Sequence, residues 1–424
     1  MIKIYNYNDI KIDEIFARDI EDTSSVEETV SGIIENVRKN GDEALRFYAD
    51  KFDGGAPDSL LVSEEEIEAA MNEVSPELID ILKKAKANIE AFHKNQVRQS
   101  FIMNEKEGVV TGQKIIPIEK AGLYVPGGTA AYPSSVLMNA VPAKIAGCRE
   151  IVITTPAKGG KINPVILAAA KIGGVDKVFK VGGAQAIAAL AYGTQSVPKV
   201  DKIVGPGNAF VAEAKKQVYG RVSIDMIAGP SEILVIADGK SNPAFVASDL
   251  LSQAEHDKMA SAVLVTESGT LAKNVSEELE RQLPLLAREE IARASIDNNG
   301  KIIIVDNIET AVAVSNEIAP EHLELCVDNP FDYLDSIKHA GSIFMGRYCP
   351  EALGDYFAGT NHTLPTSGTA RFSSPLSVDD FVKKTQYTYY TEKALRKVSD
   401  DIYNFAMAEG LEAHAKSAVS RFKK

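Results

Sequence analysis

Two series of short apolar segments alternate with helical segments, and this alternation constrains the fold more than any other feature of the chain. The first series supplies expected strands at 150–154 and 177–181, and the second supplies strands at 233–237, 262–265 and 302–305. Strands that alternate with helices form parallel sheets covered by helices on their faces. The sequence therefore predicts an α/β protein with two parallel sheets.

Helical spacing of apolar residues dominates the first hundred residues and returns near the C-terminus. From these patterns we expect an arm at 1–20 and a first α/β domain built from 21–123 and 233–376. A second α/β domain, which carries the glycine loops, is expected at 124–232. Residues 377–424 are expected to form a helical tail.

The composition excludes several classes of partner. The 424 residues include 46 Lys and Arg against 59 Asp and Glu, a net charge of −13 without any basic run, so we expect no nucleic acid or membrane partner. Its three cysteines, Cys148, Cys326 and Cys349, lack Cys-x-x-Cys spacing, which favours a reducing compartment. No signal peptide and no apolar run of the ~18 residues that span a bilayer is visible. We expect a cytoplasmic protein.

A candidate metal site lies between 224 and 257. Asn242 and Pro243 have the pattern of a helix N-cap followed by proline at the first helical position. If this helix runs to the strand at 262–265, Gln253 and His256 lie three residues apart on one face and can share a metal ion. Oxygen and nitrogen donors without sulfur suit a substrate-holding Zn²⁺ with open positions.

Two further polar clusters could carry chemistry. Glu321 and His322 precede an alternating strand, and they can serve one site only if Pro320 holds them in a bend. There they would form a general acid/base pair, although most such dipeptides are only charged strand entrances. Asp355 and His362 lie in a glycine-rich loop, whose irregular composition is equally consistent with a turn and with function.

Three glycine turns follow expected strands of the first series. Such turns bind nucleotides at the carboxyl ends of parallel strands, where backbone N–H groups face the phosphates. The Gly-x-Gly-x-x-Gly spacing is missing because Phe210 occupies the place of its third glycine. Each loop alone is consistent with an ordinary turn, but together they favour a nucleotide. The residues that would contact it are Tyr124, Gln185 and Asn208.

Seven strings of this chain resemble the histidinol dehydrogenase family. In order, they are Gly-Leu-Tyr-Val-Pro-Gly-Gly at 122–128, Val-Gly-Gly-Ala-Gln-Ala-Ile-Ala-Ala-Leu at 181–190, Gly-Pro-Gly-Asn-Ala-Phe at 205–210, Ala-Gly-Pro-Ser-Glu at 228–232, Ser-Gln-Ala-Glu-His at 252–256, Ala-Pro-Glu-His-Leu-Glu at 319–324 and Gly-Thr-Asn-His-Thr-Leu-Pro-Thr at 359–366. Because they span most of the chain in the expected order, together they are far more specific than any single motif.

The resemblance implies an enzyme of the last two steps of histidine biosynthesis. Such an enzyme is a homodimer with one Zn²⁺ per subunit, and it oxidises L-histidinol to L-histidine through L-histidinaldehyde with two NAD⁺. The implied fold has two incomplete Rossmann-like parallel-sheet domains, with small helical segments at both ends and tails exchanged between subunits. This fold agrees with the missing glycine fingerprint.

The resemblance also assigns roles to individual residues. It implies that Glu321 and His322 form the acid/base pair and that NAD⁺ contacts Tyr124, Gln185 and Asn208. The implied zinc ligands are Gln253, His256 and Asp355, with His414 as the fourth ligand from the partner subunit. The implied substrate contacts are Ser231, Gln253, His256, His322, Asp355, His362, Glu409 and His414, of which Glu409 and His414 cross the dimer interface.

Asp257 departs from the family, in which glycine usually follows the metal-binding histidine. We expect this difference to alter metal affinity slightly. Two other functions compete with a dehydrogenase. A zinc-dependent hydrolase could use a metal-bound water beside Glu321, and a nucleotide-binding homologue could keep the fold without catalysis.

Overall fold

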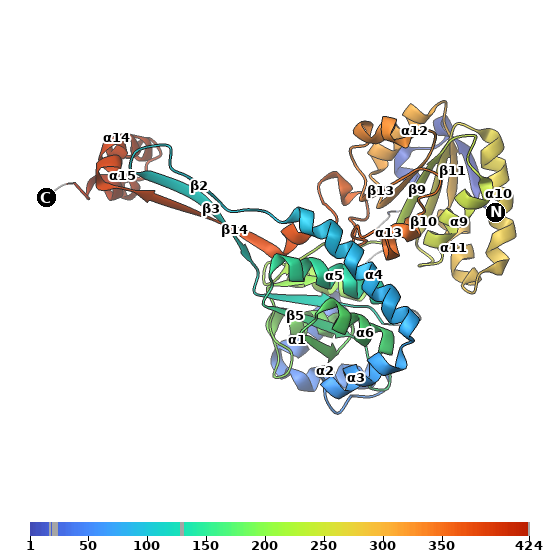
Figure 1. The fold of residues 1–424 in the computed structure, drawn as a ribbon, viewed down its shortest axis with the longest axis horizontal. Coiled ribbons are helices and arrows are strands. Elements are labelled where there is room, and N and C mark those ends of the chain that lie inside the picture. Colours follow the sequence, from blue (N-terminus) through green and yellow to red (C-terminus); the bar gives the residue numbers. More distant parts are fainter. Residues whose placement is uncertain (17, 19–23, 128–130, 423–424) are drawn as a thin grey trace. The chain divides into compact units, whose positions relative to one another are not determined.

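A computed structural model of the protein describes residues 1–16, 18, 24–127 and 131–422. The chain divides into two compact units, each of which is described by itself (Figure 1). The larger unit combines Met1–Gln96 with Ile118–Phe381, and the smaller combines Val97–Pro117 with Val382–Lys424. Residues 17, 19 and 20 of the expected arm and Gly128 of the first glycine turn lie outside the described residues.

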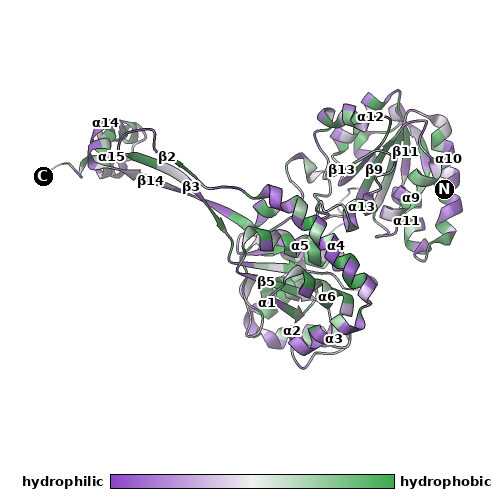
Figure 2. Cartoon of the chain, viewed as in Figure 1, coloured by the Kyte–Doolittle hydropathy of each residue, from purple (hydrophilic) through white to green (hydrophobic). Residues whose placement is uncertain are grey.

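A six-stranded parallel sheet forms one half of the larger unit, in the order β1-β11-β10-β9-β12-β13. Its strands are β1 (Lys3–Asn6), β9 (Glu232–Ala237), β10 (Ser261–Thr266), β11 (Lys301–Ile304), β12 (His322–Cys326) and β13 (Ser342–Met345). Its helices are α9 (Pro243–Ala254), α10 (Gly269–Gln282), α11 (Glu289–Asn299), α12 (Ile308–Ile318) and α13 (Glu351–Tyr356). Helices α9, α10 and α11 share an apolar core with one face of the sheet, and α12 shares a core with the other. The strands β9 and β10 are buried along their whole length, which is why they read as continuous apolar runs (Figure 2).

A five-stranded parallel sheet forms the other half, in the order β6-β5-β4-β7-β8. Its strands are β4 (Lys120–Tyr124), β5 (Glu150–Thr155), β6 (Lys177–Lys180), β7 (Lys202–Val204) and β8 (Ser223–Ile224). The helices with it are α1 (Ser24–Asn40), α2 (Asp42–Phe52), α3 (Glu64–Glu73), α4 (Pro76–His93), α5 (Pro133–Ala146), α6 (Pro164–Gly173), α7 (Gly183–Tyr192) and α8 (Ala209–Val218). The expected α/β class with two parallel sheets is confirmed.

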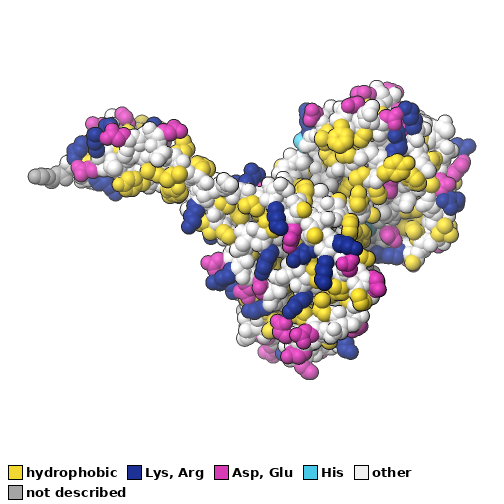
Figure 3. Space-filling model, viewed as in Figure 1, with side chains coloured by type: hydrophobic (Ala, Val, Ile, Leu, Met, Phe, Trp, Pro, Cys, Tyr) yellow, Lys and Arg dark blue, Asp and Glu magenta, His cyan; other side chains and the backbone are white. Residues whose placement is uncertain are grey.

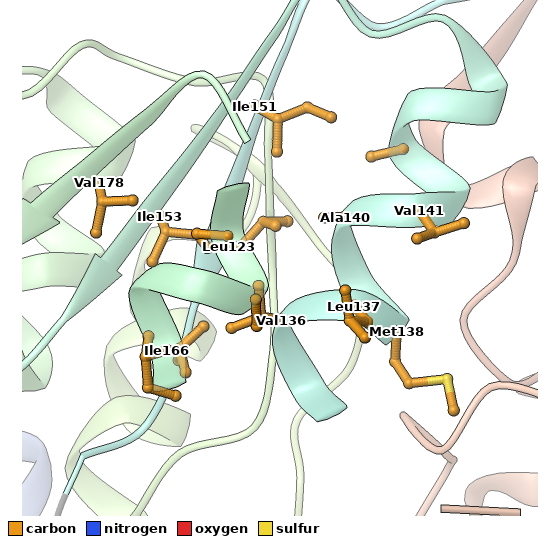
Figure 4. Packing of buried hydrophobic residues seen from close by; sticks show 14 of the residues in the cluster. Leu123, Val136, Leu137, Met138, Ala140, Val141, Ile151, Ile153, Ile166 and Val178 are labelled. Carbon is orange, nitrogen blue, oxygen red and sulfur yellow. The ribbon is translucent and has the colours of Figure 1, made fainter. Parts of the chain in front are cut away.

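The core of the five-stranded sheet shows how apolar spacing becomes packing. Leu123, Ile151 and Ile153 on the strands contribute to one buried cluster with Val136 and Leu137 of α5 (Figure 4). Each of these side chains is at most 1 % exposed. Complete burial of such a side chain contributes roughly 1.5–3 kcal/mol, so this cluster stabilises the scaffold beneath the glycine turns.

The N-terminal helices differ from the expected grouping of 21–123 with 233–376. Helices α3 and α4 share a core with one face of the five-stranded sheet, and α1 and α2 share a core with the other. Strand β4 also belongs to this sheet, because it pairs with β5 and β7. A sheet can recruit helices from any part of the chain, so amphipathic spacing alone did not reveal which sheet these helices cover.

The smaller unit contains a three-stranded antiparallel sheet, in the order β14-β3-β2, and two helices. Its elements are β2 (Phe101–Met103), β3 (Val109–Pro117), β14 (Val382–Tyr390), α14 (Glu392–Ala408) and α15 (Glu412–Val419). The prediction of a wholly helical tail was therefore wrong for residues 382–390. This segment is rich in Thr and Tyr, which favour strands, and it pairs with β3 along its whole length.

The surface charges and the lengths of the helices can be compared with the expected absence of nucleic acid and membrane partners. On the face shown in Figure 3, Lys and Arg side chains lie among Asp and Glu side chains. Among the helices that the structure describes, none is long and apolar enough to cross a membrane.

Candidate active site

One cavity of about 550 Å³ in the larger unit brings together most of the predicted site residues. The glycine turn after β7 contributes to its wall, as do the residues just before β9 and β12. The five-stranded sheet thus presents carboxyl strand ends, and the six-stranded sheet presents amino strand ends. The predicted residues that line the cavity are Asn208, Ser231, Gln253, His256, Glu321, His322, Asp355 and His362.

The bend that the acid/base pair requires is present. Ala319 adopts the left-handed conformation with φ of 52°, and His322 begins β12 two residues after Pro320. Glu321 Oε2 consequently lies 3.6 Å from His322 Nδ1, although the two residues are adjacent in sequence. Both side chains are buried.

The hydrogen bonds of His322 fix its tautomer. Nδ1 lies 3.0 Å from the backbone oxygen of Glu232, which can only accept, so Nδ1 carries the proton. Burial lowers the pKa of His322, which favours the neutral ring. Nε2 is buried and has no hydrogen-bond partner within the described chain. It therefore offers a free lone pair, 3.7 Å from Glu351 Oε1.

Glu321 lines the cavity close to other carboxyl groups. Its Oε2 accepts the backbone N–H of Glu232 at 2.9 Å. Burial raises the pKa of Glu321 well above its usual range, and the neighbouring carboxylates of Glu232, Glu351 and Asp355 raise it further. A buried carboxyl group with a raised pKa can exchange a proton with a bound molecule.

The donors predicted for a metal line one wall of the cavity. Gln253 is 1 % exposed, and its Oε1 is one of the buried oxygens without a partner among the described residues. Burial lowers the pKa of His256, so its ring is neutral as ligation requires, although the nearby Asp355 opposes this shift. An orphaned amide oxygen, a neutral imidazole and a carboxylate fit a divalent cation such as Zn²⁺.

Helix α9 starts where the sequence predicted and ends earlier than expected. Asn242 Oδ1 caps it by accepting the N–H of Ala244. The helix stops at Ala254, and His256 lies in the following turn, where its N–H donates to Gln253 O at 3.1 Å. The expectation that Gln253 and His256 share one helical face was therefore wrong. They still line the same cavity because the turn redirects His256 toward it.

Asp257 takes part in the turn after α9. Its Oδ1 accepts the N–H of Met259 at 2.8 Å, and the residue lines the cavity. The Asp257 side chain thus stabilises the turn that carries His256. Glycine has no side chain and cannot form this hydrogen bond.

The expectation that Asp355 and His362 share a glycine-rich loop was wrong for Asp355, because Glu351–Tyr356 forms α13. His362 approaches Asp355 from the irregular segment that follows this helix. Its Nδ1 lies 3.7 Å from Asp355 Oδ1, and its Nε2 lies 3.2 Å from Ser135 Oγ. Burial lowers the pKa of His362. The neighbouring Asn361 anchors the segment by donating to Met138 O at 2.7 Å.

The residues predicted to contact a nucleotide are not gathered in the cavity. Asn208 lines it and also caps α8, where its Oδ1 accepts the N–H groups of Phe210 and Val211. Tyr124 and Gln185 are buried beside the Gly183 turn and do not belong to the described lining. The Tyr124 hydroxyl accepts the N–H of Gly183 at 3.1 Å, and burial raises its pKa to about 12.

A buried ion pair holds the turn after β7. Lys215 and Asp225, with side chains 2 % and 1 % exposed, pair with each other and also grip the backbone of Gly205. Asp225 Oδ2 accepts the Gly205 N–H at 2.7 Å, and Lys215 Nζ donates to Gly205 O at 3.0 Å. Gly205 has φ of 117°, and an added Cβ would lie 2.1 Å from Tyr124 O. The turn is thus fixed by side chains on both sides.

The Lys215→Met variant should lose stability. Removal of the ammonium leaves the Asp225 carboxylate buried without its charge partner, which costs about 3–5 kcal/mol. Chemical denaturation of the variant and the wild type measures the difference. Lys216→Met is the matched control, because that side chain is 52 % exposed and its loss should change stability by no more than about 0.5 kcal/mol. Equal effects of the two substitutions would contradict the clamping role.

Sequence reasoning missed several residues that support the site. No sequence motif distinguishes Lys215 from the other lysines of the chain. Glu232 lay inside a matched string, but its backbone contacts could not be read from it. Glu351 accepts the Ser252 hydroxyl at 2.8 Å, and burial raises the Glu351 pKa to about 7. Donor atoms of His322, Glu351 and Asp355 lie within 4.8 Å of one another, a grouping that only the folded chain reveals.

Glu409 and His414 belong to the smaller unit. Both are exposed, and both line a cavity of about 760 Å³ between the apolar faces of α14 and α15. Their predicted place in the site requires a second subunit.

Comparisons with known proteins point to one family. The family profile described as histidinol dehydrogenase matches residues 16–422. Histidinol dehydrogenase of Clostridium acetobutylicum is 58 % identical over 404 residues, which cover 95 % of this chain and 94 % of that protein. The Listeria monocytogenes enzyme of that name is 56 % identical, with 94 % and 93 % covered. The crystal structure of histidinol dehydrogenase from Elizabethkingia anophelis has a TM-score of 0.94 and 41 % identity, and covers 99 % of this chain and 98 % of that one. This chain therefore belongs to the histidinol dehydrogenase family.

Proposed function

We propose that this protein oxidises L-histidinol to L-histidine through L-histidinaldehyde, with two NAD⁺, in the last steps of histidine biosynthesis. The observation that carries the proposal is the free Nε2 of His322, whose ring is neutral and anchored through Nδ1 beside Glu321. Removal of an alcohol proton requires such a base. The family membership supplies the substrate class.

Gln253, His256 and Asp355 are proposed to hold one Zn²⁺ per subunit. When bound, the ion supplies a Lewis-acid anchor for the imidazole and amine of the substrate. The support for this assignment is the orphaned Gln253 Oε1 together with the neutral His256 ring. Ser231 and His362, which line the same cavity, are proposed to bind the substrate beside these donors.

His322 is proposed to remove the alcohol proton at Nε2 while a hydride leaves the adjacent carbon for NAD⁺. Glu321 then removes a proton from the water that adds to the aldehyde, and the resulting hydrate gives up the second hydride. The Glu232 backbone keeps both side chains in place during these steps, because it bonds Glu321 Oε2 and His322 Nδ1. Burial of the pair restricts loss of the aldehyde to solvent.

The nucleotide is proposed to bind at the glycine turns of the five-stranded sheet, with contacts to Tyr124, Gln185 and Asn208. The N-terminus of α8 follows the turn held by Lys215 and Asp225, which suits a phosphate group. Tyr124 and Gln185 are buried, so their proposed contribution requires the nucleotide to reach the Gly183 turn.

A covalent route through a cysteine is disfavoured. Cys326 lies on the same strand as His322, but its thiol is buried and 4.0 Å from Glu324 Oε2. Burial and that carboxyl group raise the pKa of the thiol far above neutrality. A protonated thiol is a poor nucleophile, so Cys326 is a packing residue. Cys148, Cys326 and Cys349 are free thiols, which is consistent with the proposed cytoplasmic location.

The working enzyme is proposed to be a homodimer with exchanged tails and two incomplete Rossmann-like domains per subunit. Its substrate site is completed by Glu409 and His414 of the partner chain, with His414 as a zinc ligand. The apolar faces of α14 and α15 support this proposal, because Phe405 is 71 % exposed and lines the cavity between the two helices.

Stoichiometry of the reaction tests the function. With excess NAD⁺, each L-histidinol should yield two NADH, and chelation of the metal should abolish turnover until Zn²⁺ is restored. Bound metal is counted in the same preparation. A competing zinc hydrolase would release product from an ester or amide without reduced nicotinamide. A nucleotide-binding homologue without catalysis would bind NAD⁺ and leave L-histidinol unchanged.

A further inference from the structure

We propose that Arg18 and Glu232 form a positioning pair that holds Glu321 and His322 in their working geometry. This inference rests on the proposed function, because that function gives Glu321 and His322 their acid and base roles. Neither Arg18 nor Glu232 belongs to the described lining of the cavity. They act through the backbone and not through contact with substrate.

The backbone of Glu232 forms hydrogen bonds with the side chains of both members of the acid/base pair. Its N–H donates to Glu321 Oε2 at 2.9 Å, and its carbonyl oxygen accepts from His322 Nδ1 at 3.0 Å. Any displacement of this first residue of β9 would therefore move the carboxyl of Glu321 and the ring of His322 together.

The Glu232 side chain is clamped by a bidentate ion pair. Arg18 Nε donates to Oε1 at 2.8 Å, and Arg18 Nη2 donates to Oε2 at 2.8 Å. The carboxylate is only 4 % exposed, so it depends on this guanidinium for compensation of its charge. Two parallel hydrogen bonds also fix the orientation of the carboxylate, which a single point charge does not.

The Arg18 guanidinium also bonds the end of α12, in addition to Glu232 at the start of β9. Arg18 Nη1 donates to Ile318 O at 2.7 Å, at the last residue of α12. Glu321 follows three residues later, after the left-handed bend at Ala319. Arg18 thus links the start of β9 to the segment that carries the pair. Gly368 packs close to the Arg18 guanidinium, because a Cβ added to Gly368 would lie 2.8 Å from Arg18 Nη1.

Four variants test the positioning role: Arg18→Met, Arg18→Lys, Glu232→Gln and the Arg18→Met/Glu232→Gln double variant. For folded Arg18→Met, kcat should fall about 10–100-fold, since small misplacements of catalytic groups have effects of that size. The KM for L-histidinol should stay within about twofold, because the substrate-binding groups are untouched. Arg18→Lys should be intermediate, and the double variant should be no slower than the slower single variant.

Arg293→Met is the matched control, because Arg293 forms a similar ion pair with Glu280 at 2.6 Å but lies on α11, away from the pair. It should leave kcat unchanged even if it lowers the unfolding temperature. Should Arg18→Met not fold, Arg18→Lys and Glu232→Gln carry the test. Folded variants with wild-type kcat, or losses that multiply in the double variant, would overturn the proposal. A wild-type protein that yields no NADH would instead refute the proposed function itself.

Discussion

The Glu321→Gln variant should stop after the first oxidation. Glutamine keeps the size of the side chain and an oxygen that can accept the Glu232 N–H, so the geometry is preserved. It cannot remove a proton from water, so oxidation of L-histidinaldehyde should slow by about 10²–10⁴-fold. Single-turnover experiments with L-histidinol should show one NADH formed rapidly and the second delayed by that factor.

The pH dependence of the second step provides an independent measurement of the same group. Glu321 acts as a base, so its ionised fraction sets the rate. Because burial and neighbouring carboxylates raise its pKa, this fraction is lost as the pH falls through a value above the usual range for glutamate. The wild type should therefore show an acid limb at unusually high pH in L-histidinaldehyde oxidation. The limb should be absent from Glu321→Gln.

Glu324→Gln serves as the control for this prediction. Glu324 is also buried on β12, and burial together with Asp249 raises its pKa well above the usual range. Its Oε1 accepts the Glu351 N–H at 2.7 Å, a bond that an amide oxygen can keep. Since Glu324 is outside the described cavity lining and the amide can keep this hydrogen bond, both oxidation steps should be nearly unaffected. Equal losses in the two variants, or a normal second step in Glu321→Gln, would refute the role of Glu321.

The sequence predicted the α/β class because buried parallel strands leave continuous apolar runs. It also located the bend before β12, since Pro320 is visible in the sequence and adjacent residues of a strand cannot share a face. The sequence did not predict which sheet the helices at 24–93 cover. Amphipathic spacing indicates that a helix buries one face, but it does not indicate which sheet that face covers.

The candidate site was predictable to the extent that its residues lie in distinctive strings. Gln253, His256, Glu321 and His362 were found in this way, and one cavity brings them together. Arg18 was not found, because its role depends on contacts with residues more than two hundred positions away. Helix α9 also ends before His256, because the sequence marked where this helix begins but left its end open up to the strand expected at 262–265.

The His256→Asn variant should lose both its metal and its activity. His256 is a neutral, partly buried imidazole near Asp355, and asparagine offers neither its reach nor its basicity. We expect less than one Zn²⁺ per subunit after dialysis and a kcat at least about 10²-fold lower, because ligand loss also misplaces the substrate. His339→Asn is the control, as that residue is outside the described cavity lining and should keep full metal content.

Mixed dimers decide whether the same metal site draws on two chains. If His414 serves the partner's site, a dimer of one His256→Asn chain and one His414→Asn chain contains one intact site. Random mixing of the two inactive proteins should then restore about a quarter of wild-type activity, because half of the dimers are hybrids with one working site of two. If both residues served the same chain's site, every site in every dimer would lack a ligand. Recovery of zinc together with activity would establish the exchange of tails, and mixtures that stay inactive after verified subunit exchange would exclude it.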